Sequence, residues 1–417
     1  MTEKIVESDE TALPKLLAQA EPTFQQPGGA KVSQHFYFKS AIWSPDGTCV
    51  VANGSDNHIR NYVIPPNLLE HRDAQLLLEP FCTVASFESV NALACYPGYN
   101  LQSPSTTLML STARDHPIRL NSMLTGELVA SYPLISPTTE AYIVPHSLYF
   151  RADGQKFIAG SESLLSIFDV SRNGEGPLSS YKTGPKNARC SWSNPASSIR
   201  GFVSTLDIDN QHNVLAAGTL SRHVGLYDAA GEGECLGTFS IQGTEADQHI
   251  DGDGITQLRW SQCGRYLYIA ERKSDGVLIY DIRATGQLLS WLEGRQANTN
   301  QRMQIDVVNN DDGGPQCFAG GRDGYVRFWK APHLQQGAVM PDVQFEVHSG
   351  KFDLHGMSHP FIHANFTDLV NSVSMHATAS VLVTASGQRA SGSEATKTKE
   401  PPSPGCLKLW DITPAFP

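Results

Sequence analysis

The sequence has little positive charge for its length and no pattern that would place it in a membrane. Its 31 lysines and arginines are outnumbered by 42 aspartates and glutamates, which gives a formal net charge of −11. No apolar run approaches the ~18 residues that a membrane helix needs, and the N-terminus lacks a signal-peptide pattern. An acidic chain argues against tight non-specific binding to nucleic acid, which requires many neutralised phosphates, but it is compatible with a local basic patch. Because the sequence has neither a long apolar run nor a signal-peptide pattern, we expect no membrane partner.

Paired cysteines and the common catalytic motifs are also missing. The eight cysteines are scattered from Cys49 to Cys406 without paired spacing, so we expect reduced cysteines in an intracellular protein. The sequence has no Gly-x-Ser-x-Gly elbow, no phosphate-binding Gly-x4-Gly-Lys loop and no His-Glu-x-x-His pair. We expect neither enzymatic activity nor a cofactor.

Two segments contain metal-ligand residue types without the geometry that a metal site needs. In "HSGKFDLHGMSHPFIHANF", His355, His359 and His363 are four residues apart, but a glycine and a proline interrupt the helix that would align them. The segment "EADQHIDGDG", residues 245–254, lacks the bidentate acid of a calcium loop. We expect both to be polar loops, with no bound metal.

What the sequence does contain is a repeat. Each of seven units has an apolar strand, a turn, a second strand, a polar turn and a strand that ends near an aromatic residue. The units begin "AIWSPDG", "ALACYPG", "SLYFRADG", "TLDIDNQ", "QLRWSQCG", "QIDVVNN" and "SVSMHAT", and the last unit ends in the literal dipeptide Trp410-Asp411. Such short strands bury both faces only when the sheets stack around an axis. The fold class is therefore all-β, a seven-bladed WD-repeat β-propeller.

The remaining segments suggest how the propeller is closed and interrupted. Too few residues follow the last unit for a fourth strand, so we expect the N-terminal region, within residues 24–36, to complete the last blade and remove an exposed sheet edge. We expect a disordered arm at residues 1–20 and the propeller at 21–417. Within the propeller, 335–368 is expected to be a linker between blades six and seven, and 390–405, rich in Ser, Lys, Glu and Pro, a disordered loop.

The stretches "STARDHPIRLNSMLTGELVASY", "VPHSLYFRADGQ", "TNQRMQID" and "TASGQR" resemble the telomerase Cajal-body protein family, over residues from about 38 to 411. The resemblance favours a fungal-type relative. It implies a nuclear, non-enzymatic WD-repeat scaffold that binds small Cajal-body or telomerase-type non-coding RNA and supports localisation or assembly of ribonucleoproteins. It also implies ribonucleoprotein proteins as partners and the nucleus, in the Cajal body or its equivalent, as the location. We expect a monomer.

Cations in the turns between second and third strands, and beside the strands that open two blades, are the candidate RNA-binding residues. Arginine suits this role because its planar fork binds phosphate and its face stacks on bases. The candidates are Arg114, Arg222, Arg272, Lys273, Arg302, Arg322, Arg389 and His146. The alternative is structural: the turn cations pair with nearby acids such as Asp115, Asp275 or Asp323, and the histidine is hydrogen-bonded within its blade.

A second function remains open at this point. The propeller could instead be a protein-binding adaptor, in pre-mRNA splicing, small nuclear ribonucleoprotein maturation or ubiquitin transfer. The charge of the channel mouth separates the two functions, because a basic rim favours RNA and a neutral rim with exposed aromatic residues favours a peptide.

Overall fold

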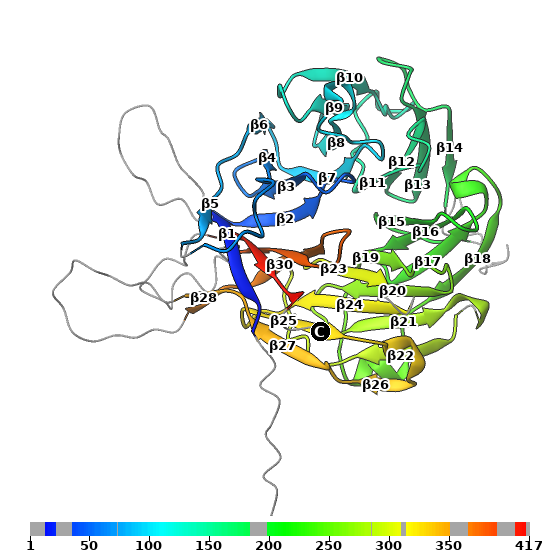
Figure 1. Cartoon of the computed structure of the whole chain (residues 1–417). Coiled ribbons are helices and arrows are strands. Elements are labelled where there is room, and N and C mark those ends of the chain that lie inside the picture. Colours follow the sequence, from blue (N-terminus) through cyan, green and yellow to red (C-terminus); the bar gives the residue numbers. More distant parts are fainter. Residues whose placement is uncertain are drawn as a thin grey trace, which may run out of the picture.

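The structure, a computed structural model, describes residues 13–21, 36–72, 74–183, 198–284, 286–309, 314–350, 366–389 and 405–413. Within these ranges the chain consists of short strands and single 3₁₀ turns. Seven sheets of four or five strands stand around a common axis (Figure 1). The predicted seven-bladed β-propeller is confirmed. In the same ranges, no helix is long and apolar enough to span a membrane.

Blades one to three follow each other along the chain, each with its first strand nearest the axis. Blade one contains β2 (Phe38–Trp43), β3 (Cys49–Gly54), β4 (His58–Val63) and β6 (Cys82–Ala85). Blade two contains β7 (Val90–Cys95), β8 (Leu108–Ala113), β9 (Ile118–Ser122) and β10 (Leu128–Tyr132), with η1 (Pro104–Thr106) before β8. Blade three contains β11 (Ser147–Phe150), β12 (Lys156–Ser161), β13 (Leu164–Asp169) and β14 (Ser179–Lys182).

Blades four to six repeat this order. Blade four contains β15 (Val203–Asp209), β16 (Val214–Thr219), β17 (His223–Tyr227) and β18 (Cys235–Ser240). Blade five contains β19 (Ile255–Trp260), β20 (Tyr266–Glu271), β21 (Val277–Asp281), β22 (Leu288–Leu292) and β26 (Gly337–Val339). Blade six contains β23 (Ile305–Asn309), β24 (Pro315–Gly320), β25 (Tyr325–Trp329) and β27 (Val343–Glu346). The connections contain η3 (Ala229–Gly231), η4 (Glu245–Gln248), η5 (Ile282–Ala284) and η6 (Pro332–Leu334).

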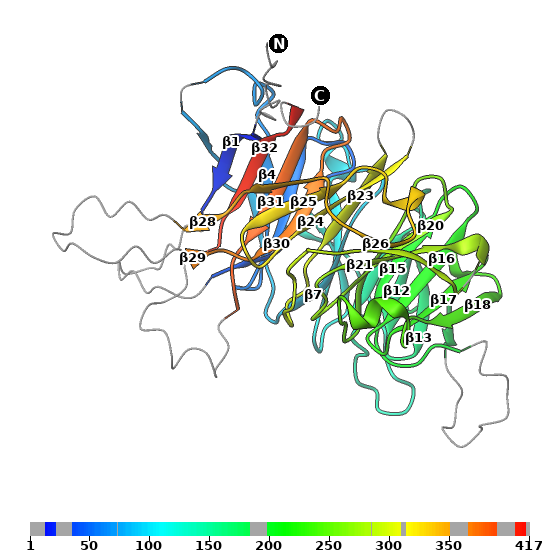
Figure 2. The same cartoon turned by 90° about the horizontal axis from the view of Figure 1, so that it is seen from below.

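The last blade is completed by the N-terminal region, as predicted, but by a different segment. Blade seven contains β30 (Val370–Met375), β31 (Val381–Ser386), β32 (Leu407–Asp411), β1 (Lys15–Ala20) and the short β5 (Leu76–Leu77). Strand β1 pairs antiparallel with β32, beside which it lies in Figure 2. The expected closing segment, 24–36, lies outside the described residues except for Phe36.

The expected disordered arm at 1–20 is therefore wrong for its last six residues, which form β1. The physical reason is a bulge between Leu16 and Ala18, where the register shifts by one residue. A bulge breaks the strict alternation that marks a strand in a sequence. Consecutive residues Leu17 and Ala18 are both buried, so the segment does not read as an alternating strand. Residues 1–12 lie outside the described ranges.

The expected linker 335–368 is also corrected in part, because it supplies strands to two blades. Strand β27 pairs antiparallel with β25 and forms the outer strand of blade six. Strand β26 adds to blade five by pairing parallel with β22. The final piece includes the two-residue strands β28 (Ser349–Gly350) and β29 (Phe366–Thr367), which pair with each other. Residues 351–365, and the expected disordered loop 390–405 up to Gly405, lie outside the described residues.

Apolar side chains fill the spaces between neighbouring blades and explain the strand pattern. Each of seven buried clusters lies between one pair of adjacent blades. Strand β3 is buried along its whole length because its alternate residues face different neighbours. Val50 and Ala52 pack in the cluster shared with blade seven, and Cys49 and Val51 in the cluster shared with blade two. This packing closes the ring.

The tight turns between first and second strands behave as the sequence predicts. In "SPDG", the Gly47 amide donates to the Ser44 carbonyl at 2.8 Å, and Gly47 has φ of +70°. A Cβ at this glycine would lie 2.2 Å from Nε2 of His376 in blade seven. Glycine is therefore required both for the left-handed conformation and for close contact between the two blades.

Candidate functional site

The inner strands and the connections between blades enclose a central channel of about 1700 Å³. Among the described residues that line this channel, none is an aspartate or a glutamate. The cations that line it are Lys39, Arg259, Arg302, Arg322 and Arg389, with His146 beside them. On a chain with a net charge of −11, this lining collects positive charge in one place.

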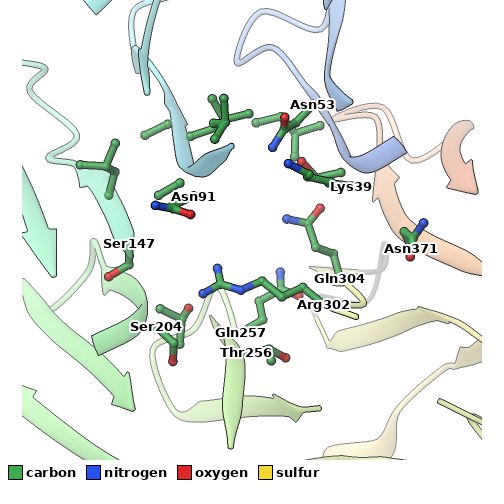
Figure 3. A pocket seen from close by; sticks show the side chains of 18 of the residues that line it. Lys39, Asn53, Asn91, Ser147, Ser204, Thr256, Gln257, Arg302, Gln304 and Asn371 are labelled. Atoms are coloured by element: carbon green, nitrogen blue, oxygen red, sulfur yellow. The ribbon is translucent and has the colours of Figure 1, made fainter. Parts of the chain in front are cut away.

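Besides apolar residues such as Ile42 and Leu148, amides and hydroxyls line the channel, and several of them fix neighbouring inner strands to each other. In Figure 3 these side chains surround the channel: Asn53, Asn91, Ser147, Ser204, Thr256, Gln257, Gln304 and Asn371. The Ser147 hydroxyl, for example, donates to the Val203 carbonyl at 2.8 Å. Asn371 Nδ2 donates to the Phe38 carbonyl at 2.8 Å and so joins blades seven and one. The wall of the channel is therefore polar and held by hydrogen bonds between blades.

Arg302 reaches furthest into this channel among the side chains that Figure 3 labels. It lies in the connection between blades five and six, whose backbone is anchored on both sides. The neighbouring Gln301 Nε2 donates to Asn371 Oδ1 at 2.8 Å, and the Met303 carbonyl accepts from buried Arg295 at 2.8 Å. The Arg302 side chain is exposed to the channel, and partial desolvation by the surrounding channel wall lowers the pKa of its guanidinium. Within the described ranges it forms no ion pair, so its hydrogen-bond donors are available to a ligand.

Arg389 lies at the same mouth, in the connection from β31 to β32, three residues after β31 ends. Its backbone amide donates to Gln301 Oε1 at 2.7 Å, which links it to the Arg302 segment. Its guanidinium has no ion-pair partner among the described residues. Nearby Lys39 donates from Nζ to Ser89 Oγ at 2.8 Å. Burial lowers the pKa of Lys39, Asp56 raises it, and the positive charge of Arg389 lowers it again. Two like charges therefore face one region of the channel mouth.

Arg322 and His146 also line the channel, and they differ in exposure and in charge. Arg322 Nη1 donates to the Asn298 carbonyl at 2.9 Å, not to Asp323, and its side chain is exposed. The half-buried His146 ring meets Phe202 edge-on, with centroids 4.8 Å apart. Burial lowers the pKa of His146, and the charge of Arg302 lowers it further. His146 is therefore neutral at neutral pH and contributes an aromatic surface.

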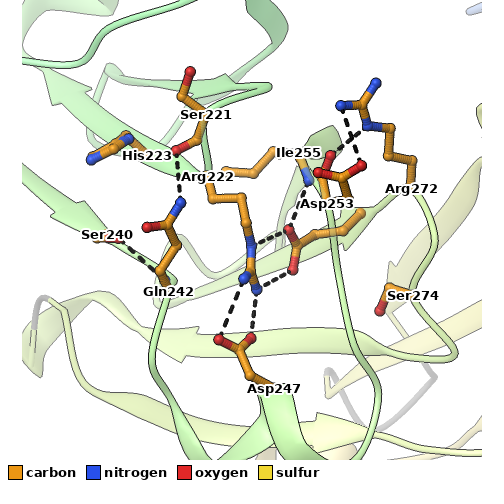
Figure 4. Close-up of polar contacts among 12 residues, drawn as sticks. Ser221, Arg222, His223, Ser240, Gln242, Asp247, Asp253, Ile255, Arg272 and Ser274 are labelled. Carbon is orange, nitrogen blue, oxygen red and sulfur yellow. Dashed lines mark hydrogen bonds and ion pairs between the residues drawn. The ribbon is translucent and has the colours of Figure 1, made fainter.

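Three predicted cations lie away from the channel lining, in ion pairs, and Figure 4 shows two of them, Arg222 and Arg272. Arg222 Nε donates to Glu271 at 2.6 Å, and its Nη2 to Asp247 at 2.5 Å. Burial lowers the pKa of Arg222, but the hydrogen bonds with Asp247 and Glu271 outweigh burial and raise it. Arg272 and Lys273 both pair with one carboxylate, Asp253, at 3.6 Å and 3.0 Å. Their expected partner Asp275 does not form these pairs.

The other predicted sites are also placed by the structure. Arg114 is highly exposed and pairs with Asp115 at 3.5 Å, outside the channel lining. In the ranges described, no group of three or more His, Cys, Asp or Glu side chains is arranged to hold a metal ion. His355, His359 and His363 lie outside those ranges.

Sequence reasoning missed two channel cations, Lys39 and Arg259, because it considered only turns and the segments that open blades. Both lie on innermost strands, at positions that face the channel. Arg259 is balanced by Asp306, 3.9 Å away, and by Asp207, so it is a structural group. Lys39 forms no ion pair within the described ranges, and a lysine within a first strand was the available signal.

Comparison with known proteins adds the family. No model of a protein family matches the chain. It is 30% identical over 322 residues to Guanine nucleotide-binding protein negative regulator 1 of Schizosaccharomyces pombe, which covers 76% of this chain and 74% of that protein. It is 28% identical over 358 residues to mouse Telomerase Cajal body protein 1, covering 85% of this chain and 59% of the mouse protein. Protein SWT21 of Vanderwaltozyma polyspora is 29% identical over 313 residues, 72% of this chain and 68% of that protein.

The likeness extends along most of the propeller and includes both fungal and animal relatives, although the chain spans only about three fifths (59%) of the mouse protein. The predicted family agrees with these relatives, and the predicted seven-bladed fold agrees with the structure. The chain belongs to the telomerase Cajal-body protein family of WD-repeat propellers, together with its fungal relatives.

Proposed function

We propose that this propeller is a scaffold that binds structured non-coding RNA at its channel mouth. The observation that carries the proposal is the charge of the lining, which contains Lys39, Arg302, Arg322 and Arg389 and no carboxylate among its described residues. An acidic protein that keeps its carboxylates out of one polar channel creates a local attraction for anions there. The same charge would not favour a neutral peptide.

The chemistry of the lining fits an unpaired stretch of RNA. Arg302 and Arg389, without ion-pair partners in the described ranges, offer planar forks that bind phosphate through two hydrogen bonds. Amide side chains such as Asn91 and Gln304 lie close by in the channel and can donate to and accept from base edges. RNA loops expose phosphates and base edges together, since the bases of a loop are unstacked and splayed.

The names of the relatives support a more specific proposal for the RNA and its location. The name of the mouse relative refers to telomerase and the Cajal body, which supports small Cajal-body or telomerase-type RNA as the ligand. It equally supports the nucleus, in the Cajal body or its equivalent, as the site of action. We propose that the chain acts as a monomer and brings this RNA to ribonucleoprotein proteins.

Fluorescence anisotropy with a labelled Cajal-body-type RNA loop tests the proposal. Arg302→Ala and Lys39→Ala should each weaken binding by about 1 kcal/mol or more, since each removes a charged contact. Arg283→Ala is the matched control. This exposed arginine pairs with Asp281 at the C-terminal end of β21 and does not line the channel. Equal affinities of all four proteins for the RNA would overturn the proposal.

A protein ligand is the second candidate. The name of the S. pombe relative refers to negative regulation of a guanine nucleotide-binding protein. Outer strand β10 exposes two apolar side chains, Leu128 at 55% and Val129 at 49%, which suit a protein contact. If this candidate is correct, Leu128→Asp with Val129→Asp should abolish capture of a purified guanine nucleotide-binding protein. The RNA affinity of that variant should be unchanged.

A further inference from the structure

Phe87 lies in the connection between β6 and β7, on the channel face, with 81% of its side chain exposed. It is the most exposed large apolar side chain among the described residues. A single exposed apolar side chain is common on protein surfaces, but Phe87 stands beside a second ring and a cation, and together they form a surface that a partner can contact. The residues that surround the ring indicate the chemistry of that partner.

The backbone that carries the ring is held by hydrogen bonds. The Ser86 amide donates to the Asn57 carbonyl at 2.9 Å, and the Ser86 hydroxyl to the Glu88 carbonyl at 2.8 Å. These bonds fix the backbone on both sides of Phe87. An ordered aromatic ring binds a flat ligand with little loss of conformational entropy.

A second aromatic ring and a cation adjoin Phe87. The His116 ring lies nearly parallel to it, at an interplanar angle of 10° with centroids 5.9 Å apart. Nδ1 of His116 lies 2.6 Å from the Arg114 carbonyl, which orients the imidazole. The Arg119 guanidinium lies 5.7 Å from the Phe87 ring centre and has no ion pair within the described ranges. A flat apolar surface beside an unpaired cation matches a nucleobase and its phosphate.

This surface continues into the channel mouth. Ser89, two residues after Phe87, lines the channel and accepts the hydrogen bond from Lys39 Nζ. Because two residues of backbone span at most about 7 Å, the Phe87 backbone lies close to the cationic lining. The two surfaces can contact successive parts of one strand.

We propose that Phe87, supported by His116 and Arg119, is a platform on which an unpaired base of the bound RNA stacks as the strand leaves the channel mouth. The proposal rests on RNA binding by the channel and adds a specific contact to it. Stacking is tolerant of base identity because every base has a π face. The platform therefore increases affinity for single-stranded RNA without selecting a sequence.

The test uses a short single-stranded RNA and an abasic oligomer of the same length, which has the phosphates but no bases. Phe87→Ala should weaken binding of the RNA about tenfold and leave binding of the abasic oligomer unchanged. Phe87→Trp should retain RNA affinity. Phe81→Ala is the matched control, because Phe81 is also exposed, at 62%, and lies at the other end of β6. With 2-aminopurine in the RNA, wild type should quench its fluorescence more than Phe87→Ala does.

Two results would overturn the platform and leave the channel proposal intact. In the first, Phe87→Ala binds the RNA as wild type does, while Arg302→Ala binds it more weakly. In the second, Phe87→Ala weakens the RNA and the abasic oligomer equally, which would show that no base is stacked. If wild type binds neither oligomer, both the channel proposal and the platform are wrong. Melting curves of the Phe87 variants confirm that they are folded.

Discussion

Cationic side chains on the channel face differ in what surrounds them. Arg222, with 12% of its side chain exposed, lies between two carboxylates, whereas Arg302 and Arg389 have no ion pair in the part of the chain that the structure describes. A guanidinium that already donates to carboxylates cannot bind a phosphate without leaving those carboxylates unpaired. Ion-paired arginines such as Arg222 stabilise the fold, whereas Arg302 and Arg389 are available to a ligand.

Replacing Arg222 should therefore reduce stability and not RNA affinity. Arg222→Ala leaves Glu271, only 1% exposed, without its ion-pair partner, and removing one member of a buried pair costs about 3 kcal/mol. Burial already raises the pKa of Glu271, although Arg222 lowers it. Urea unfolding measures this loss, with Arg283→Ala as an exposed control. A variant that unfolds like wild type but binds RNA poorly would show that Arg222 is a ligand contact.

Arg389 should show the opposite behaviour. Arg389→Ala should weaken RNA binding by roughly 1 to 3 kcal/mol, the size of an arginine–base or stacking contact. Arg389→Lys should recover only part of this, because lysine keeps the charge and loses the planar fork. If the residue contacts a phosphate, the alanine variant should also reduce the salt dependence of binding by about one unit of slope. A loss of melting temperature without a change in affinity would contradict this assignment.

At the scale of single elements, β1 determines whether the ring is closed. Deleting residues through Ala20 removes Leu17, Ala18 and Ala20 from the cluster between blades seven and one and leaves the edge of β32 unpaired. Burial of one leucine alone contributes about 1.5 to 3 kcal/mol, so the melting temperature should fall sharply. Deleting only residues 1–12 should preserve it, because β1 remains. Equal stability of both truncations would show that another segment closes blade seven.

The core of blade seven contains a histidine that should make stability depend on pH. His348 is 1% exposed, with Nε2 2.9 Å from the Thr384 hydroxyl and Nδ1 3.2 Å from Cys406 Sγ. Burial, and then the charge of Lys408, hold its pKa well below the ordinary value. The fold thus favours the neutral ring, so the contribution of this ring to stability is present above about pH 6.5 and is lost as the pH falls below that value.

Urea unfolding of wild type and His348→Gln at neutral and mildly acidic pH isolates this effect. Wild type should lose up to about 1.4 kcal/mol more per pH unit than the variant, the limit for one proton. Comparing the two proteins cancels the contributions of other titrating groups such as Glu271. Parallel pH profiles would show that His348 does not titrate across this range.

At the scale of the whole molecule, repetition made the fold predictable. Each unit repeats the same strand and turn pattern, and errors in one unit do not disturb the others. The exceptions are strands whose signals are weak when read alone. Strand β1 contains a bulge, and β27 has four residues with only Phe345 buried. Such strands form because an edge of a neighbouring strand is available, which a local pattern does not reveal.

The candidate site could be predicted less well, because partners come from other blades. The turns that carry the predicted cations can be located from the repeat, and the bond from the Lys273 amide to the Thr299 carbonyl shows that one of them meets a connection between blades. It does not indicate that Asp247, 25 residues beyond Arg222, reaches that arginine. Nor does it indicate that Lys39 faces Arg389. Pairing between distant residues decides which cations remain available.

The most direct test of the central claim is crosslinking of RNA to the protein in its own cells, followed by sequencing of the RNA. We expect wild type to enrich small Cajal-body or telomerase-type non-coding RNA, and peptides crosslinked to RNA to come from the channel mouth. A variant with Lys39→Ala, Arg302→Ala and Arg389→Ala should lose this enrichment at equal protein abundance. Folded wild-type protein that enriches no RNA above background, or a triple variant that enriches the same RNA equally well, would contradict the account.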